Sequence, residues 1–332
     1  MNHLGKQIED ISQAVPLPEQ VQYYTVDEEA VGQRIDNLLL RLFKGVPKSH
    51  VYRIVRSGEV RVNKGRIGAD YKLVLGDVVR IPPMRFSPKN EAPQVPASEF
   101  PVLFEDTHLL IINKPAGTAV HGGSGVSFGV IEQLRAARPQ AKFLELVHRL
   151  DRETSGILLL AKKRSALTAL HEVIRAGQME KRYFVLVHGL WQNERQHVRL
   201  ALHKFTTAEG DRRVVVRDDG QAAHTIFNRI ETFRDTPWGD FTLLEADLKT
   251  GRTHQIRVHL SHLGFPIVGD EKYGDFARNK SLLKEGSKRM FLHAHHVELD
   301  HPHTGERLLL DAPLPPACES FINRLRSAGE TL

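Results

Sequence analysis

The chain has 332 residues, 41% of them hydrophobic and 26% charged, which is the composition of a soluble globular protein with room for two ordinary domains. No apolar run approaches the roughly 18 residues that a membrane-spanning helix needs, and the N-terminus has neither the basic start nor the apolar stretch of an export signal. The formal net charge of +6 favours a polyanionic partner, and a single cysteine, Cys318, fits a reducing cytoplasm.

The N-terminal quarter of the chain predicts a flexible tail and then a small folded module. Residues 1–21 are polar and show no sustained hydrophobic period. From residue 34 onward apolar residues recur at helical spacing, with glycines where the helices would end, and alternation then indicates a strand. The expected order within residues 22–82 is two short helices and two strands, at 34–42, 48–56, 60–62 and 78–81.

This small module concentrates basic charge. Nine lysines or arginines and only two acidic residues lie between residues 34 and 66, so the local excess of seven exceeds the net charge of the whole chain. Each cation that meets a phosphate releases counterions and adds affinity for nucleic acid, which favours RNA contact over a merely solvated face. The candidate contacts are Arg34, Lys48, Arg53, Arg56 and Lys64. The charge and the order of elements resemble the S4 RNA-binding module, a resemblance that implies RNA contact by the second helix and the loop after it.

A proline-rich stretch then separates this module from a larger region. Six prolines fall between residues 82 and 101, which predicts a stiff linker over 83–99. Residues 100–320 alternate strands with a few helices, and 321–332 are expected to be a tail. The expected elements are strands at 102–104, 109–112, 157–161, 183–187, 213–217, 224–231 and 241–248, and a helix between Ser165 and Gly177.

One stretch of the larger region, HRLDRETSG at 148–156, places a single carboxylate between two arginines. Asp151 comes shortly before the apolar run 157–161, which predicts a loop supported by a buried strand. Taken alone, such a carboxylate most often forms an exposed ion pair with Arg149 or Arg152. The alternative is that a rigidly held loop presents it for chemistry.

Two further segments, KRYFVLVHG at 181–189 and KTGRTHQIRVHLSHLG at 249–264, mix charged residues with apolar ones. A strand through the second would place Arg252 and His254 on one face with Ile256, which suits the wall of a cleft. The region is dense in histidine, but it lacks the spacing of zinc ligands, and Arg252 and Arg257 would repel a cation. No metal site is therefore expected, and neither a phosphate-binding loop nor a nucleophilic serine motif is evident.

The combination of motifs carries a family resemblance. HRLDRETSG, NKPAG at 113–117, KRY at 181–183 and GRTHQIRVH at 251–259 follow an S4-like module in this order, and together they resemble the RluA family of pseudouridine synthases. The resemblance implies an α+β fold, an S4-like domain followed by a catalytic domain built on a mainly antiparallel mixed sheet. It also implies isomerisation of specific uridines to pseudouridine in large-subunit (23S) ribosomal RNA or in the assembling large subunit. No cofactor is implied, and we expect a cytoplasmic monomer.

The same resemblance assigns roles to individual residues. Asp151 would act as a nucleophile at C1′ of the ribose or as a base that removes the 2′-hydrogen, and the sequence does not choose between the two. Tyr183 would stack on the base, Arg252 would pair with Asp151, and Arg149 would fill the place that the flipped uridine leaves. Further RNA contacts are expected from His148, His254 and Arg257.

Two other functions are compatible with parts of this pattern. One is a non-catalytic RNA-binding factor in ribosome assembly, and the other is an RNA phosphodiesterase or N-glycosidase that uses Asp151. The presence of Asp151, Tyr183 and Arg252 together favours catalysis over the first. The lack of a metal signature disfavours a metal-dependent nuclease.

Overall fold

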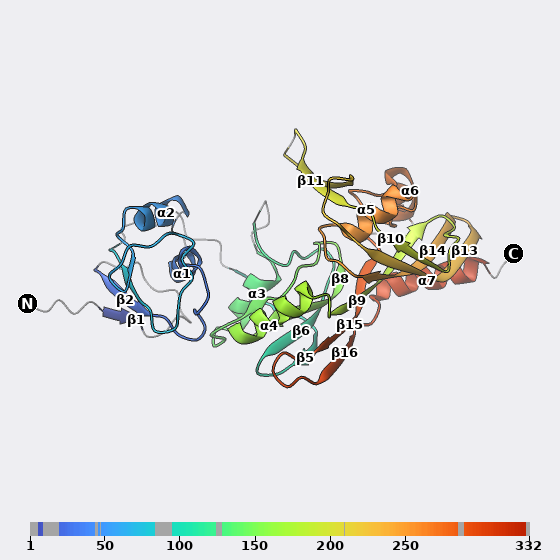
Figure 1. The fold of residues 1–332 in the computed structure, drawn as a ribbon. Helices are drawn as coiled ribbons and strands as arrows, with labels where there is room; N and C mark the ends of the chain where they lie inside the picture. The colour runs from blue at the N-terminus through green and yellow to red at the C-terminus, as the bar shows by residue number, and fades with distance from the viewer. Residues whose placement is uncertain are drawn as a thin grey trace, which may run out of the picture. The chain divides into compact units, whose positions relative to one another are not determined.

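The computed structural model describes residues 6–8, 20–43, 46, 48–83, 95–123, 128–208, 210–284 and 289–329 (Figure 1). Most of the predicted N-terminal tail and of the predicted linker lies outside these ranges. The described chain forms two compact units. The first holds the chain up to Ser98 with Gln133–Glu145 and Ala161–Leu167, and the second holds Glu99–Glu132, Leu146–Leu160 and the chain from Thr168 onward.

The N-terminal unit combines two helices with a small sheet. The helices predicted from apolar spacing are confirmed, and α1 buries Ile35, Leu38, Leu39 and Leu42 in one core with the apolar face of α2. The sheet has the strand order β1-β2-β4-β3. The elements are α1 (Ile35–Leu42), α2 (Lys48–Arg56), β1 (Lys6–Ile8), β2 (Gln22–Thr25), β3 (Arg61–Val62) and β4 (Val78–Ile81).

A tight turn follows β3. Asn63 and Lys64 both have positive φ, 49° and 68°, and the backbones of Val62 and Gly65 exchange hydrogen bonds of 3.1 and 2.8 Å across them. Positive φ at both central residues characterises a two-residue type I′ turn, and asparagine tolerates that conformation well. The turn leaves Lys64 exposed at its tip.

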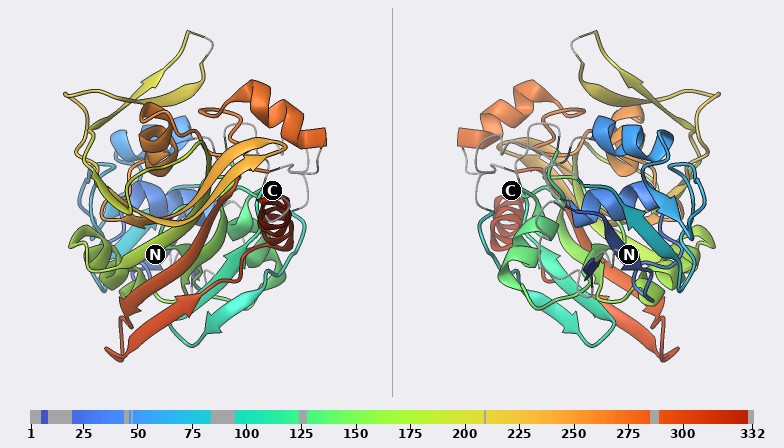
Figure 2. Two further views of the ribbon diagram at one scale, coloured as in Figure 1. Left: turned by 90° about the vertical axis from the view of Figure 1, so that its right-hand side faces the viewer. Right: turned by 90° about the vertical axis from the view of Figure 1, so that its left-hand side faces the viewer.

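The second unit is built on one large mixed sheet, seen from two sides in Figure 2. Its strand order is β10-β13-β14-β9-β15-β8-β6-β5, with β16 added beside β15 and β7 beside β8. Neighbouring strands of this order run antiparallel in β10–β13–β14–β9–β15 and in β6–β5, whereas β15 and β8 are parallel. The predicted α+β class with a mainly antiparallel mixed sheet is confirmed. The strands are β5 (Val102–Glu105), β6 (Leu109–Lys114), β7 (Glu145–Leu146), β8 (Ser155–Ala161), β9 (Glu180–His188), β10 (Arg195–Val198), β13 (Thr225–Thr236), β14 (Gly239–Leu248), β15 (Leu292–Asp300) and β16 (Arg307–Asp311).

Helices and a hairpin complete the chain. The hairpin of β11 and β12 forms a separate two-stranded sheet that extends away from the large one (Figures 1 and 2). No helix within the described ranges is both long enough and apolar enough to cross a membrane. The remaining elements are β11 (Leu202–Thr206), β12 (Arg212–Val216), α3 (Val130–Ala137), α4 (Arg164–Arg175), α5 (Gln255–His262), α6 (Phe276–Lys284) and α7 (Pro316–Gly329).

The C-terminal helix α7 corrects one prediction, because residues 321–329 are not a tail. Phe321, Ile322 and Leu325 are buried with Cys318 against residues of β13 and β14. These apolar residues recur at helical spacing, and Pro316 occupies the first helical position, where a missing amide hydrogen costs nothing. Pro316 therefore marks the start of a helix that continues through most of the predicted tail.

The parallel contact between β8 and β15 joins the loop of Asp151 to the centre of the sheet. Gly156 has a φ of +111°, and a Cβ atom there would lie 2.2 Å from the carbonyl oxygen of Ala294, so only glycine permits this approach. Beside it, Ser155 Oγ lies 2.8 Å from Nδ1 of the buried His293, whose Nε2 lies 3.2 Å from the carbonyl oxygen of Ala312. Both ring nitrogens are thus satisfied with a neutral imidazole.

This buried histidine predicts a loss of stability in acid. Burial lowers the pKa of His293 to about 4. An unfolded histidine has a pKa near 6.5, so the unfolded chain binds more protons between pH 6.5 and pH 4, and the free energy of unfolding falls as the pH is lowered through that window. The loss from His293 is expected to be about 3 kcal/mol. Urea unfolding at pH 4.5 and pH 7 should show a smaller difference for His293→Gln than for the wild type, and an equal difference would contradict the assignment.

Candidate active site

The loop between β7 and β8 carries Asp151, as predicted from the buried run behind it. Every residue of β8 is buried, and the backbone amide of Thr154 donates to the carbonyl oxygen of Asp151 at 3.1 Å. His148 ties the start of the loop to β8, because its Nε2 accepts a hydrogen bond of 3.2 Å from the Leu159 amide. Burial lowers the pKa of His148 to about 4, so the ring is a neutral acceptor at neutral pH. Its predicted contact with RNA stays a prediction.

The NKPAG motif, which ends β6 and forms the turn after it, is hydrogen-bonded to the loop of Asp151 at Arg152. The Nζ of the fully buried Lys114 donates to the carbonyl oxygens of Pro115, Thr118 and Arg152 at 2.8, 2.8 and 3.1 Å. Gly117 and Arg152 are joined by two more bonds, from the Gly117 amide at 2.9 Å and from Arg152 Nε at 3.0 Å. Burial lowers the pKa of Lys114 to about 7, and its three hydrogen bonds explain how an ammonium group is accommodated there. Arg152 therefore serves to fix the loop.

The cation that pairs with Asp151 is Arg257, not Arg252. Arg257 Nη1 donates to Asp151 Oδ2 at 2.9 Å, and its Nε and Nη2 bind both oxygens of the buried Asp270 at 2.7 and 2.8 Å. Burial by itself would lower the pKa of Arg257, but the two carboxylates raise it above its usual value. Two charge-assisted bonds thus fix the guanidinium to Asp270, and the third orients Asp151.

The predicted pairing of Arg252 with Asp151 is wrong for a local structural reason. Arg252 is exposed, and its Nε donates to the carbonyl oxygen of Ala222 at 3.1 Å. The segment predicted as a strand is instead a loop followed by the helix α5, which begins at Gln255. Helical geometry turns Arg257 toward Asp151, whereas Arg252 stays in the loop at the edge of the site.

Polar residues buried inside α5 explain why its helical period was missed. All residues from Gln255 to Leu260 are buried, so the helix has no polar face. Gln255 is held by Thr250, Thr225, the Arg252 amide and the carbonyl oxygen of His224, while His259 lies between Thr225 and the carbonyl oxygen of Leu200. A helix whose first six residues are all buried, with satisfied polar side chains among them, resembles an alternating strand in sequence.

His254 is the second neighbour of Asp151. It adopts a left-handed backbone conformation, with φ of 54°, and its Nε2 lies 3.7 Å from Asp151 Oδ1. Its Nδ1 lies 2.8 Å from the hydroxyl of Tyr273, which also accepts a hydrogen bond from the Val214 amide. Burial lowers the pKa of His254 despite the nearby carboxylate, so the ring is neutral. A proton on Nε2, facing Asp151, satisfies all of these contacts.

Asp270 and Tyr273 were missed by the sequence analysis. Both follow α5 in the sequence GDEKYG, where a lone Asp and Tyr give no recognisable spacing relative to Asp151. Burial alone would raise the pKa of Asp270, but hydrogen bonds from Arg257 and from the amides of Tyr273 and Lys272 hold it below its usual range. Asp270 thus holds Arg257, and Tyr273 holds His254, next to Asp151.

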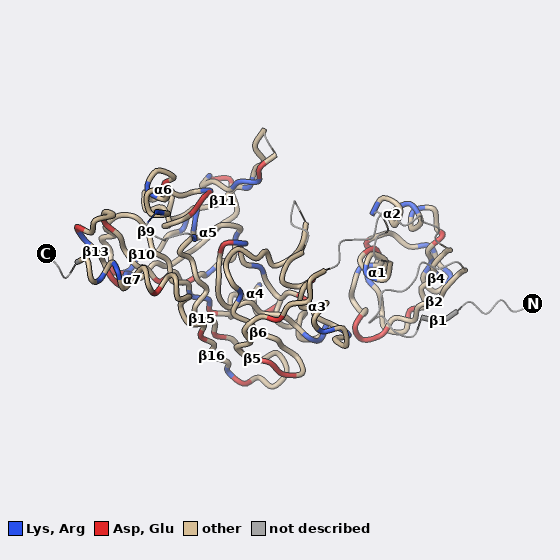
Figure 3. The backbone as a smooth tube through the Cα atoms, turned by 180° about the vertical axis from the view of Figure 1, so that it is seen from behind, with Lys and Arg blue, Asp and Glu red and all other residues tan. Residues whose placement is uncertain are grey.

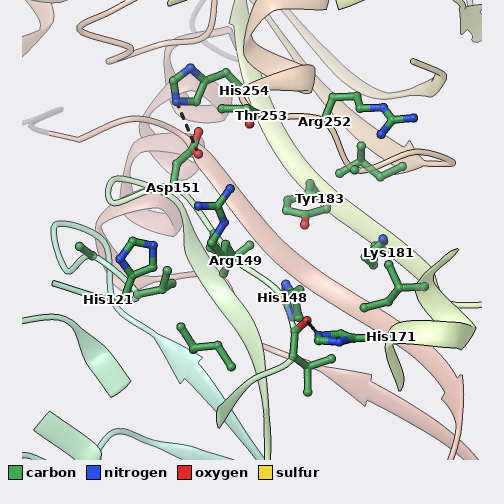
Figure 4. A pocket seen from close by; sticks show the side chains of 18 of the residues that line it. His121, His148, Arg149, Asp151, His171, Lys181, Tyr183, Arg252, Thr253 and His254 are labelled. Atoms are coloured by element: carbon green, nitrogen blue, oxygen red, sulfur yellow. Dashed lines mark hydrogen bonds and ion pairs between the residues drawn. The ribbon is translucent and has the colours of Figure 1, made fainter. Parts of the chain in front are cut away.

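Asp151 lies where two adjoining cavities meet. The larger has a volume of about 910 Å³ and the smaller about 100 Å³, and both are lined by Asp151, Arg149, Tyr183, Arg252 and His254. Figure 4 shows these side chains around the larger cavity. Tyr183 is 7% exposed, and burial, with a smaller contribution from the charge of Asp151, raises its pKa. Its phenol is therefore protonated at neutral pH, which suits stacking or hydrogen-bond donation.

One group of potential metal ligands occurs among the described residues, and its bonding explains it without an ion. Asp106, His108 and His301 have ligand atoms within 4.8 Å of one another. His301 Nδ1 accepts hydrogen bonds from the backbone amides of His303 and Thr304, at 3.3 and 3.0 Å, so the ring proton lies on Nε2 and is donated to Asp106 at 2.9 Å. A metal would need that Nε2 lone pair. The cluster therefore fits a hydrogen-bonded junction of two turns.

The five lysines and arginines of the N-terminal unit that are predicted to contact RNA differ in whether they form ion pairs with acidic residues. Lys48, Arg56 and Lys64 are exposed. Arg34 pairs with Asp36 at 2.7 Å and Arg53 with Glu59 at 3.2 Å. Figure 3 shows lysine and arginine positions gathered around α2. A role in RNA contact remains a prediction for all five.

Comparison with known proteins identifies both parts of the chain. Residues 108–262 match the family described as RNA pseudouridylate synthase, and residues 33–79 match the S4 domain. The chain is 50% identical to "Ribosomal large subunit pseudouridine synthase C" of Haemophilus ducreyi over 92% of its own length and 96% of that protein's. It is 48% identical to the protein of the same name from Escherichia coli K12, over 93% and 98% of the two lengths. A solved structure, human RNA Pseudouridylate Synthase Domain Containing 4, aligns with a TM-score of 0.54 at 27% identity over 68% of this chain and 93% of that one.

Proposed function

Because the chain belongs to the RNA pseudouridylate synthase family and carries an S4 domain, we propose that it converts specific uridines to pseudouridine in large-subunit ribosomal RNA. Relatives named for that subunit match it at about 50% identity over more than nine-tenths of both chains, which supports this choice of substrate. The observation that carries the chemistry is Asp151, which is oriented by Arg257 and lines a cavity together with Tyr183.

The reaction is an isomerisation and needs no second substrate. The bond from N1 of uracil to C1′ of the ribose breaks, and a bond from C5 to C1′ forms. C5 loses its proton, and N1 gains one. Asp151 can serve this sequence as a nucleophile that bonds to C1′ when N1 leaves, or as a base that removes the 2′-hydrogen to give a glycal.

The surroundings of Asp151 support either role for an ionised carboxylate. Arg257 occupies Oδ2, which leaves Oδ1 directed toward His254 and the cavity. Because Arg257 is itself fixed by Asp270, the carboxylate is held in place before the substrate arrives. Such preorganisation is expected to make a large contribution to the rate.

The target uridine must leave folded RNA to reach Asp151. Flipping costs a few kcal/mol, which contacts in the pocket must offset. Tyr183 lines the larger cavity and can stack on the uracil. Arg149 is exposed on the loop of Asp151, where it can enter the place that the base leaves in the RNA. The low exposure of Tyr183 and the high exposure of Arg149 support this division of roles.

The N-terminal unit is proposed to hold the RNA through phosphates. A triple change, Lys48→Gln, Arg56→Gln and Lys64→Gln, should weaken RNA binding and lower the slope of log K against log salt by about 0.7–0.9 for each lost contact. The rate with saturating RNA should change little, because the site of Asp151 is intact. Filter binding between 50 and 300 mM salt measures the slope. A charge-matched control, Lys280→Gln with Arg307→Gln and Arg326→Gln, should leave it unchanged, and an equal effect of both sets would contradict the role of the N-terminal unit.

The substrate itself is tested by mapping pseudouridines in ribosomal RNA. Cells that lack this protein should show uridine at defined positions of large-subunit RNA, and the wild-type chain should restore pseudouridine there. An unchanged map would overturn the proposed substrate.

A further inference from the structure

Lys181 lines the larger cavity, and it takes part in none of the contacts that hold Asp151. It belongs to β9 and precedes Tyr183 by two residues, so both side chains lie on the same face of the strand, roughly 6.6 Å apart along it. Both line the larger cavity. Figure 4 shows Lys181 across the cavity from Asp151, and its Nζ lies 4.0 Å from the position that a Cβ atom on Gly251 would take.

The ammonium group of Lys181 has no hydrogen-bond acceptor among the residues that the structure describes. Asp247 is the carboxylate that acts on it electrostatically, but Asp247 Oδ2 is already bound by Lys249 at 2.7 Å. His148 Nε2 accepts from the Leu159 amide. Lys114, a fully buried lysine near the site, meets three carbonyl oxygens, whereas Lys181 is half-buried. Lys181 therefore differs from a structural lysine, since burial lowers its pKa with no bond to compensate.

The cavity is larger than a single nucleoside requires. Its volume of about 910 Å³ is near the upper end for small-molecule sites. Beyond Tyr183 it extends to α4, which contributes Thr168, His171, Ile174 and Arg175 to the lining. His171 Nε2 is engaged with the carbonyl oxygen of Val147 at 3.0 Å, and the lining of the cavity also includes the cations Lys181 and Arg175. A cationic extension next to the base position suits the backbone of the same RNA strand.

We propose that Lys181 binds a backbone phosphate of the RNA strand beside the flipped uridine. Because Tyr183 would contact the base at the same time, only RNA with a suitable separation between base and phosphate could make both contacts. This inference rests on the proposed function and adds a specific contact to it. The phosphate supplies an acceptor, and a charge-assisted bond to a half-buried lysine is expected to be worth more than one on the open surface.

The test combines a protein change with a matched RNA change. Lys181→Met should raise KM about tenfold and leave kcat within about twofold, because it removes binding and not chemistry. The salt slope of binding should fall by about 0.7–0.9, the amount expected for one phosphate. RNAs with a neutral methylphosphonate at each phosphate flanking the target are then compared. At one of these positions the methylphosphonate should raise the KM of the wild type by the same factor of about ten. It should not raise the KM of Lys181→Met any further, because a double-mutant cycle gives no additional loss when the two groups contact each other.

Controls separate this inference from folding and from the proposed function. Lys280→Met removes an exposed lysine of the same unit and should leave KM unchanged. Lys181→Arg should retain most of the affinity, whereas the melting temperature of Lys181→Met should equal or exceed that of the wild type because a desolvated charge has been removed. Additive losses at every methylphosphonate position, or a fall in kcat at unchanged KM, would overturn the phosphate contact. If the wild type forms no pseudouridine, the proposed function fails instead.

Discussion

Asp151→Asn is expected to abolish pseudouridine formation, with a loss of about 10⁴-fold or more, while RNA binding changes only a few-fold. The amide cannot form a bond to C1′ or remove the 2′-hydrogen. It has the size of the carboxylate, and its oxygen can still accept the hydrogen bond that Arg257 donates at 2.9 Å. The loss should therefore appear in kcat and not in affinity.

The reaction is followed by release of tritium from C5-labelled uridine in large-subunit ribosomal RNA, because C5 loses its hydrogen in the isomerisation. Glu153→Gln is the matched control, since Glu153 lies on the same loop and forms an exposed pair with Arg152 at 3.4 Å. It should retain near-normal release. Normal tritium release by Asp151→Asn would sink the catalytic assignment and favour a binding factor that keeps the fold.

Arg257→Lys is expected to impair both stability and activity. Lysine is a point charge and cannot bind both oxygens of Asp270 while also donating to Asp151. Asp270 is 1% exposed, so its lost hydrogen bonds should cost about 2 kcal/mol of unfolding free energy. Loss of a fixed orientation for Asp151 should lower kcat about 100-fold. Urea unfolding at pH 7 and kcat with saturating RNA measure the two effects.

Arg252→Lys is the matched comparison for Arg257→Lys. Arg252 is exposed and makes a side-chain hydrogen bond to the carbonyl oxygen of Ala222, so the change should leave the unfolding free energy within about 0.5 kcal/mol. Should Arg257→Lys prove too unstable to assay, Asp270→Asn weakens the support of Arg257 while keeping the size of the side chain at residue 270, and it should also lower kcat. A larger loss of kcat for Arg252→Lys than for Arg257→Lys would reinstate the pairing of Arg252 with Asp151.

Local pattern was enough to predict the elements whose hydrophobic period is strong. The spacing of Ile35, Leu38, Leu39 and Leu42 predicted α1, and the apolar run before Lys162 predicted β8 and hence a supported loop for Asp151. Both predictions succeed because one face of α1 and the whole of β8 are buried. Burial of this kind produces an apolar pattern that can be recognised within one short segment of sequence. The motifs around Asp151 and Tyr183 were instead recognised by their resemblance to a known family.

The partners of Asp151 were decided by tertiary structure alone. Arg257 lies 106 residues further along the chain, and no local rule distinguishes it from Arg252 until α5 turns one toward the loop and leaves the other at its edge. Asp270 and Tyr273 complete the support through contacts equally remote from Asp151 in sequence. The sequence by itself therefore predicted the supported loop on which Asp151 lies, because burial patterns are local, while the proposed role of Asp151 came from the family resemblance. Only the tertiary structure decided which cation pairs with Asp151, because that pairing depends on which side chains from distant parts of the sequence are buried next to each other.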